Sequence, residues 1–438
     1  MDDLITTSTT RRTGHKEIFL LLTTTVILII FGEIFFRVYY LVLGKTIAAD
    51  QTELCFKEMK KATTYVSVSP NNFTYKSEWG EDPLIGLIPK KNHNDTDKLI
   101  LDLNGKNTTG IIYFHDQHNA QGLTNVEEFL IKKPKNVSIR IALFGDSFTC
   151  GAELPLKFNV ASVLKELIQN SEVLNFCMVG HGIDHMYARY FIESKKYAPE
   201  VVIFNILVDD IRRPFDCPLL RPNLTILNRH LVIGQRQWPT LQDFYFKYTP
   251  PRYESYFLKH ILWVYNKHTR LKQDMRKGIE LFGVMMDELK TQTREQNSTL
   301  IISTIIEQEP TTLEVDTYKK MLEILKEKDI NFLDTAEYFA LQKRIYNNQS
   351  FYYIRGKDHF KHFSAIGNAV FAQGLKNVLE ILRYLPPTPY YFFANFDDWA
   401  LLYFIPEIQG HIQVIPAFDI QPTLEDIHFH LKENTTTQ

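Results

Sequence analysis

A serine that follows an apolar run is the first residue of this chain whose type and position could do chemistry. The run 139–144, IRIALF, breaks abruptly into Gly145-Asp146-Ser147. Gly145 permits a tight turn, and a helix that begins after it would place the positive end of its dipole near the Ser147 hydroxyl. An acyl-transfer nucleophile needs such surroundings, because an oxyanion develops beside it. For a lone serine at a helix start, the simpler interpretation is a helix N-cap.

Later segments of the chain contain the other groups that a serine nucleophile requires. It needs a general base, a carboxylate that orients this base, and donors for the oxyanion. Gly180 lies in NFCMVGHGIDH, where a glycine lets the backbone N–H approach a substrate oxygen, and Asp209 ends the apolar run of NILVDDI. Further along, GKDHFKHFSAIGN contains Asp358, His359 and His362 just before a helical pattern. These residues are candidate partners of the serine.

The elements that must position these residues follow a regular alternation. Strand-like runs are predicted at 139–144, 172–176, 200–208, 299–306 and 330–334, and helical patterns at 160–170, 185–197, 277–297, 318–328 and 365–382. Such alternation predicts an α/β fold, a three-layer αβα sandwich with a parallel central sheet. Ligands bind at the carboxyl ends of strands in such sheets, which is where the candidate residues fall.

Taken together, these segments resemble the SGNH hydrolases, also called the GDSL-type family, in its membrane-anchored bacterial or archaeal form. ALFGDSFTCG is similar to the block that carries the nucleophile, NFCMVGHGIDH to the second block, and HFSAIGNAVFA to the last block. The resemblance, over about residues 82–382, implies an SGNH/flavodoxin-like fold. It also implies Ser147 as nucleophile, the Ser147 and Gly180 N–H groups as oxyanion donors, His362 as base and Asp358 as its orienting carboxylate. It implies no metal and no organic cofactor.

Two positions depart from the family pattern. The third block normally supplies an asparagine to the oxyanion hole, where this chain has Asp209. Either Asp209 is protonated, or Asn205 or another donor replaces it, or activity is reduced. The orienting aspartate normally lies two or three residues before the base, whereas Asp358 lies four residues before His362. His359 is therefore an alternative base.

An apolar stretch near the N-terminus predicts a membrane anchor at 18–43. The stretch contains only Glu33 and Arg37 as charged residues, and their i, i+4 spacing allows them to pair near the outer interface. Basic residues precede it closely, so the positive-inside rule places residues 1–17 in the cytoplasm and the rest of the chain outside. The alternative is a cleaved signal peptide.

Beyond the anchor, we expect a lead-in segment at 44–137 that packs on an SGNH-like domain at 138–382. An inserted hairpin is predicted at about 220–235, and the tail 383–438 is rich in aromatic residues. Eight Asn-x-Ser/Thr acceptors agree with an extracytoplasmic location: Asn72, Asn94, Asn107, Asn136, Asn223, Asn297, Asn348 and Asn434.

The four cysteines leave two possibilities open. Disulfides are possible in an oxidising compartment, and Cys150 and Cys177 both lie close to the predicted site. We nevertheless expect both to be buried thiols.

The overall prediction is a single-pass membrane protein with an extracytoplasmic serine esterase domain. The formal net charge of −2 argues against a nucleic-acid partner. The expected substrate is an acylated small molecule or glycan, in particular an O-acetyl ester of a cell-envelope glycan. Two alternatives stay open: a glycan O-acetyltransferase with the same triad, and a non-catalytic glycan-binding protein on a degenerate fold of this type.

Overall fold

The computed structural model describes residues 10–43, 53, 55–57, 79–102, 109–152, 154–217, 221–249, 255–265, 269–307, 310–346, 353–355 and 360–386. The chain divides into two compact units. One consists of residues 1–73 and 245–273, and the other of residues 74–244 and 274–438. The candidate site lies in the second unit.

The second unit is built on a five-stranded sheet in which every pairing is parallel. Its strands are β5 (Ile139–Gly145), β6 (Ser171–Asn175), β7 (Val201–Leu207), β10 (Thr299–Ile305) and β11 (Asn331–Asp334). The spatial order β6-β5-β7-β10-β11 corresponds to 2-1-3-4-5 in chain order, which is the flavodoxin-like arrangement. Ligands bind in such sheets at the switch point between the first and third strands, here β5 and β7.

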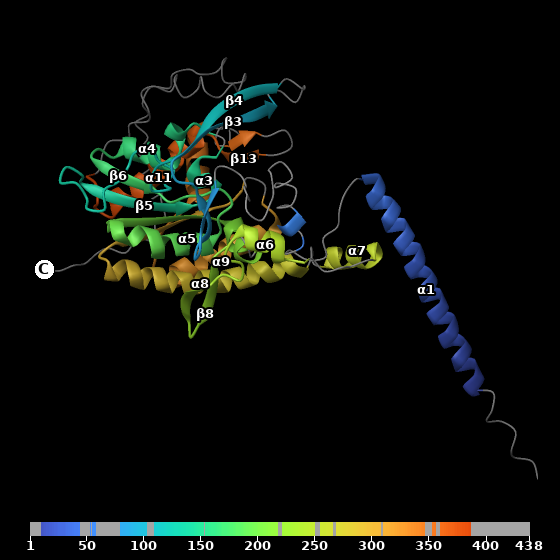
Figure 1. The fold of residues 1–438 in the computed structure, drawn as a ribbon. Coiled ribbons are helices and arrows are strands. Elements are labelled where there is room, and N and C mark those ends of the chain that lie inside the picture. Colours follow the sequence, from blue (N-terminus) through green and yellow to red (C-terminus); the bar gives the residue numbers. More distant parts are fainter. Residues whose placement is uncertain are drawn as a thin grey trace, which may run out of the picture. The chain divides into compact units, whose positions relative to one another are not determined.

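Helices cover both faces of this sheet (Figure 1). One face packs against α4 (Val160–Leu167), α10 (Thr335–Tyr346) and α11 (Ala365–Ile381), and the other against α5 (Ile183–Arg189), α8 (Leu271–Glu295) and α9 (Thr312–Glu327). The predicted three-layer αβα sandwich with a parallel sheet is therefore confirmed.

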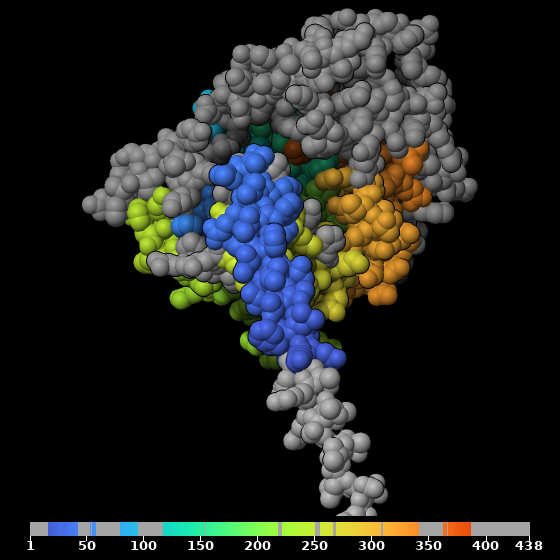
Figure 2. All heavy atoms as spheres, turned by 90° about the vertical axis from the view of Figure 1, so that its right-hand side faces the viewer, coloured from blue at the N-terminus to red at the C-terminus, as the bar shows by residue number. Residues whose placement is uncertain are grey.

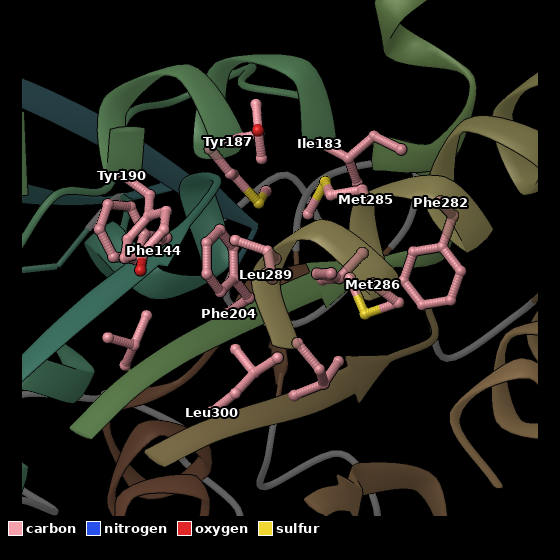
Figure 3. Close-up of a cluster of buried hydrophobic side chains, with 14 of the residues drawn as sticks. Phe144, Ile183, Tyr187, Tyr190, Phe204, Phe282, Met285, Met286, Leu289 and Leu300 are labelled. Atoms are coloured by element: carbon pink, nitrogen blue, oxygen red, sulfur yellow. The ribbon is translucent and has the colours of Figure 1, made fainter. Parts of the chain in front are cut away.

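The two cores arise from side-chain periodicity. Along β5, Ala142 and Phe144 face the α5/α8 side, whereas Ile141 and Leu143 face the α4/α11 side. Figure 3 shows the first core, where Phe144 and Phe204 from the sheet meet apolar side chains of α8, spaced three and four residues apart: Phe282, Met285, Met286 and Leu289. These long-range contacts fix the position of β5 and so of the residues that follow it.

The elements between and before the sheet strands include the predicted hairpin. The hairpin consists of β8 (Asn223–Leu227) and β9 (His230–Gly234), joined at Asn228 and Arg229, both with positive φ. The helical pattern at 185–197 is divided into α5, a π-helix at Tyr190–Ser194 and a 3-10 helix at Lys195–Tyr197. In the lead-in, two antiparallel pairs form from β1 (Trp79–Asp82), β2 (Gly86–Pro89), β3 (His93–Asp102) and β4 (Thr109–His118).

The first unit contains α1 (Thr10–Leu43) and α7 (Tyr256–Tyr265). Among the described residues, one helix, within α1 at Lys16–Val42, is long and apolar enough to cross a membrane, a test that a signal sequence also passes. Most of its apolar side chains are exposed (Figure 2), whereas Tyr40 is buried. Arg37 Nε lies 2.6 Å from Glu33 Oε1, so the predicted ion pair is present.

Candidate active site

The turn after β5 exposes the Ser147 hydroxyl to a partner, because another residue caps the helix. Asp146 is the N-cap of the short helix α3 (Ser147–Cys150), and its Oδ1 accepts a hydrogen bond from Phe148 N at 3.0 Å. The turn requires Gly145, since a Cβ there would lie 2.0 Å from Thr149 Oγ1. The N-cap interpretation of Ser147 is therefore wrong, and its hydroxyl is available for chemistry.

His362 reaches the site from the strand that precedes α11. It lies on β13 (Phe360–Phe363), which pairs with β12 (Tyr353–Arg355). Next to it, Phe363 is buried against the rings of Phe148, Phe339 and Phe371. Two residues further, Ser364 caps α11 by accepting a hydrogen bond from Gly367 N at 3.0 Å. The motif His-x-Ser-x-x-Gly is thus held by a packed ring and a helix cap, which together position the backbone that carries His362.

The fold brings these two side chains into contact across 215 positions of sequence. His362 Nε2 lies 2.8 Å from Ser147 Oγ, and the Ser147 residue is 5% exposed. At this distance Ser147 O–H can donate to Nε2 when the ring carries its proton on Nδ1. The serine proton can therefore pass to the imidazole while Ser147 Oγ attacks and forms its new bond.

Asp209 is engaged by two arginines. Arg212 donates to both of its carboxylate oxygens, at 2.6 and 3.0 Å, and Arg213 Nε donates at 3.1 Å. Both carboxylate oxygens of Asp209 are therefore occupied as hydrogen-bond acceptors, whereas an oxyanion hole needs a donor.

Asn205, the predicted replacement donor, has a buried Nδ2 without a hydrogen-bond partner among the described residues. It lies within β7, opposite Gly145 in the register, and is fully buried. Its Oδ1 accepts a hydrogen bond from Ser303 Oγ at 2.6 Å. Its register partner Gly145 is the last residue of β5, two residues before Ser147, and the role of Asn205 as a replacement donor stays a prediction.

Arg213 connects the Ser147 turn with the neighbouring strand ends. Its Nη1 donates to Asp146 Oδ2 at 3.0 Å, to Asp210 Oδ1 at 2.5 Å and to the His181 carbonyl at 2.7 Å. Burial by itself would lower the pKa of Arg213, but the surrounding carboxylates raise it above its ordinary value. Arg213 thus keeps its charge and holds the cap residue of the nucleophile turn.

The aspartate that lies next to Asp209 is buried in the same cluster. Burial, with the charge of Asp146 nearby, raises the pKa of Asp210 well above its usual range. Arg213 is not among the residues predicted from the sequence, although the spacing of DDIRR places basic residues three and four positions after Asp209.

Gly180 has the backbone freedom that the predicted oxyanion role requires. Its φ is +76°, and no heavy atom lies within 4 Å of a Cβ built on it. It is exposed in the loop that follows β6, and Arg221 Nη2 lies 3.4 Å from its carbonyl oxygen. An open, left-handed glycine at a strand end leaves room for a ligand close to the backbone.

The predicted orienting carboxylate and the alternative base, Asp358 and His359, lie outside the described residues. Their roles stay predictions.

Cys150 and Cys177 form a disulfide, with 5.4 Å between their Cα atoms. The expectation of two buried thiols is wrong, and none of the four cysteines is free. The bridge joins the end of α3, which carries Ser147, to the segment that leads from β6 to Gly180. Packing alone therefore does not hold these two parts of the site together.

Part of this chain is similar in structure to known proteins. No protein-family model matches the chain, and no curated protein matches it. Among solved structures, a protein described as lipolytic, of the G-D-S-L family from Desulfitobacterium hafniense DCB-2, is 12% identical, with a TM-score of 0.34 over 55% of this chain and 99% of that chain. Axe2, an acetylxylan esterase from Geobacillus stearothermophilus, is 17% identical, with a TM-score of 0.33 over 56% of this chain and 95% of that one. The acetyl xylan esterase AlAXEase is 14% identical, with a TM-score of 0.34 over 55% and 100%.

Proposed function

We propose that this chain is a serine ester hydrolase in which Ser147 is the nucleophile and His362 the general base. The observation that carries the proposal is the 2.8 Å separation between Ser147 Oγ and His362 Nε2. A non-catalytic descendant of such a fold has no need to keep this pair within hydrogen-bonding distance. An acyl-transfer site depends on it.

The reaction proceeds through a covalent acyl-enzyme. Ser147 Oγ attacks the ester carbonyl while His362 Nε2 takes its proton, and the resulting oxyanion accepts hydrogen bonds from the N–H groups of Ser147 and Gly180. The tetrahedral intermediate collapses, the carbon–oxygen bond to the leaving group breaks, and His362 returns the proton to the departing alcohol. A water molecule, deprotonated by His362, then releases the acid and restores Ser147. Asp358 is our candidate for holding the imidazole in the Nδ1–H tautomer.

As substrate class we propose acyl esters, in particular O-acetyl groups on a cell-envelope glycan. A domain tethered to a membrane meets such esters at the cell surface. A glycan O-acetyltransferase would use the same Ser147–His362 pair but transfer the acyl group to a second hydroxyl. Turnover that rises with added glycan acceptor, with no net release of acetate, would identify the transferase.

The test of the nucleophile is labelling by a fluorophosphonate. We expect the purified chain to react covalently and to hydrolyse acetyl esters, and we expect Ser147→Ala and His362→Ala to lower both by at least about 10³-fold. His230→Ala is the matched histidine control, because His230 lies exposed in the hairpin. A folded wild-type chain that shows neither labelling nor hydrolysis would refute the esterase.

We further propose that α1 anchors the chain in a membrane, with the second unit outside the cytoplasm. Four glycosylation acceptors fall on described side chains, and all four are exposed: Asn94, Asn136, Asn223 and Asn297. In a eukaryotic secretory host, we expect each Asn→Gln substitution to remove one endoglycosidase-sensitive shift in gel mobility. We also expect the chain to stay in the membrane fraction during carbonate extraction. Absence of every glycan would argue for a cytoplasmic orientation, and release by carbonate would argue against the anchor.

A further inference from the structure

We propose that α7 is an interfacial membrane helix, attached to α1 and embedded in the outer boundary of a phospholipid bilayer. The inference rests on the proposed anchoring by α1. It adds a second membrane-binding element that comes from a segment more than two hundred residues away in the sequence.

The first observation is that the carboxylate of Glu33 in α1 caps the N-terminus of α7. Glu33 Oε1 accepts a hydrogen bond from Tyr256 N at 3.0 Å, and Oε2 accepts from Phe257 N at 3.0 Å and from Ser255 Oγ at 2.8 Å. The first N–H groups of a helix have no partner inside the helix. Exposure of such groups to lipid is costly, and the positive end of the helix dipole favours a carboxylate there.

The second observation is close packing between the two helices. A Cβ on Gly32 would lie 2.5 Å from Phe257 Cδ2, so the absent side chain makes room for this ring. The rings of Phe36 and His260 stack with their centroids 4.0 Å apart, and Tyr40 Oη lies 2.8 Å from His260 Nδ1. The contacts thus repeat every four residues along one face of α1, at Gly32, Phe36 and Tyr40.

The third observation is the apolar surface that α7 exposes. Its large apolar side chains are exposed, from 38% to 63%: Leu258, Ile261, Trp263, Val264 and Tyr265. Lys259 is the one residue of this helix with a full charge, and its Nζ lies 3.4 Å from Glu53 Oε1. A helix that faced water would present charged side chains on this surface. Exposed apolar surface of this kind marks an interaction site.

The position of α7 along α1 selects the bilayer as its partner. About 20 residues cross the hydrocarbon core, so a span that begins at Ile18 ends near Arg37. The α7 contacts run from Gly32 to Tyr40, so they lie along the last turns of this span and just beyond it. Trp and Tyr are enriched at this depth, because one end of each ring is apolar and the other forms hydrogen bonds. Trp263 and Tyr265 fit that environment.

The experiment is tryptophan quenching in the full chain, reconstituted in phosphatidylcholine vesicles with bromine at defined acyl positions. We expect shallow bromines near the headgroup to quench one component of the fluorescence more strongly than deep bromines do, and Trp263→Phe to remove that component. Trp238→Phe is the matched control, since Trp238 packs on Phe244 in the second unit, and we expect it to leave the component in place. Equal quenching of wild type and Trp263→Phe would overturn the proposal.

Two further variants test the attachment. Glu33→Gln removes the capping charge and Gly32→Leu fills the space of the Phe257 ring, so we expect both to reduce shallow quenching of Trp263. Carbonate extraction of the same samples separates the two hypotheses. A chain that stays in the membrane without quenching at Trp263 refutes the interfacial helix alone. A chain that carbonate releases refutes the anchor itself.

Discussion

At the scale of single residues, the site depends on which side chain forms a hydrogen bond or ion pair with which partner. Asp146 caps α3, so the adjacent Ser147 can meet His362. Arg213 in turn holds Asp146, and an unpaired buried carboxylate at this position would cost several kcal/mol. The charged cluster beside the nucleophile is therefore part of the support of the turn.

The effect of Asp209→Asn on kcat follows from the partners of this carboxylate. If the Asp209 carboxylate repelled the oxyanion, its neutralisation would increase kcat. Because Asp209 is bound by Arg212 and Arg213, we expect no increase in kcat and a loss of about 1–3 kcal/mol in the free energy of unfolding. Acetyl-ester kinetics with urea denaturation of the same samples measures both. A rise in kcat of tenfold or more would show that Asp209 faces the developing charge.

At the scale of elements, β5, β6 and β13 each deliver one part of the site, and each has its own attachment. Ser364 secures the end of β13 by capping α11, while the disulfide secures the end of β6 to α3. The glycine that the resemblance assigns to the oxyanion hole thus lies three residues from a covalent link to the nucleophile turn.

Loss of this disulfide should weaken both stability and the site. The bridge closes a loop with a sequence separation of 27, for which chain-entropy arguments give about 3.5 kcal/mol. We expect the Cys150→Ser, Cys177→Ser variant to lose an amount of this order in the free energy of unfolding and to react more slowly with a fluorophosphonate under conditions where it is still folded. An unchanged midpoint of denaturation would show that packing alone holds α3 to β6.

At the scale of the whole molecule, buried histidines make stability depend on pH. Burial, with the charges of His93 and Arg189 nearby, lowers the pKa of His118 to about 3. Burial also lowers the pKa of His181 well below its ordinary value, and His185 and two arginines add to this effect. Both folded-state imidazoles are thus favoured in the neutral form.

The consequence is a loss of stability in acid. A histidine in the unfolded chain has a pKa of about 6.5, and above that pH the ring is neutral in both states, so it does not change the stability. Below that pH the unfolded chain binds protons that the folded chain does not bind. Each such histidine lowers the free energy of unfolding by about 1.4 kcal/mol for each pH unit by which the pH falls from the unfolded pKa toward the folded pKa. Carboxyl groups with raised pKa, such as Asp210, act in the opposite direction. The difference between wild type and His118→Gln therefore isolates one histidine.

We expect urea denaturation between pH 6.5 and pH 5 to show a shallower loss of stability in His118→Gln than in the wild type. Parallel curves for the two proteins would show that His118 is protonated in the folded state as readily as in the unfolded chain.

The sequence by itself determined the features that depend on near neighbours. The spacing of apolar residues predicted the strands, the main helices and hence the αβα class, and i, i+4 spacing predicted the Glu33–Arg37 pair. The residue types around Ser147 and His362 identified both as candidates before their separation was known.

Only the tertiary structure decided what depends on residues far apart in the chain. The order of the strands places Ser147 against His362, brings Arg213 to Asp146 and brings Cys150 to Cys177. No local pattern predicted that Glu33 would cap α7, because the two segments meet only after folding. Local periodicity fixes which face of an element is apolar, whereas the choice of partner for each face or polar group is made by packing.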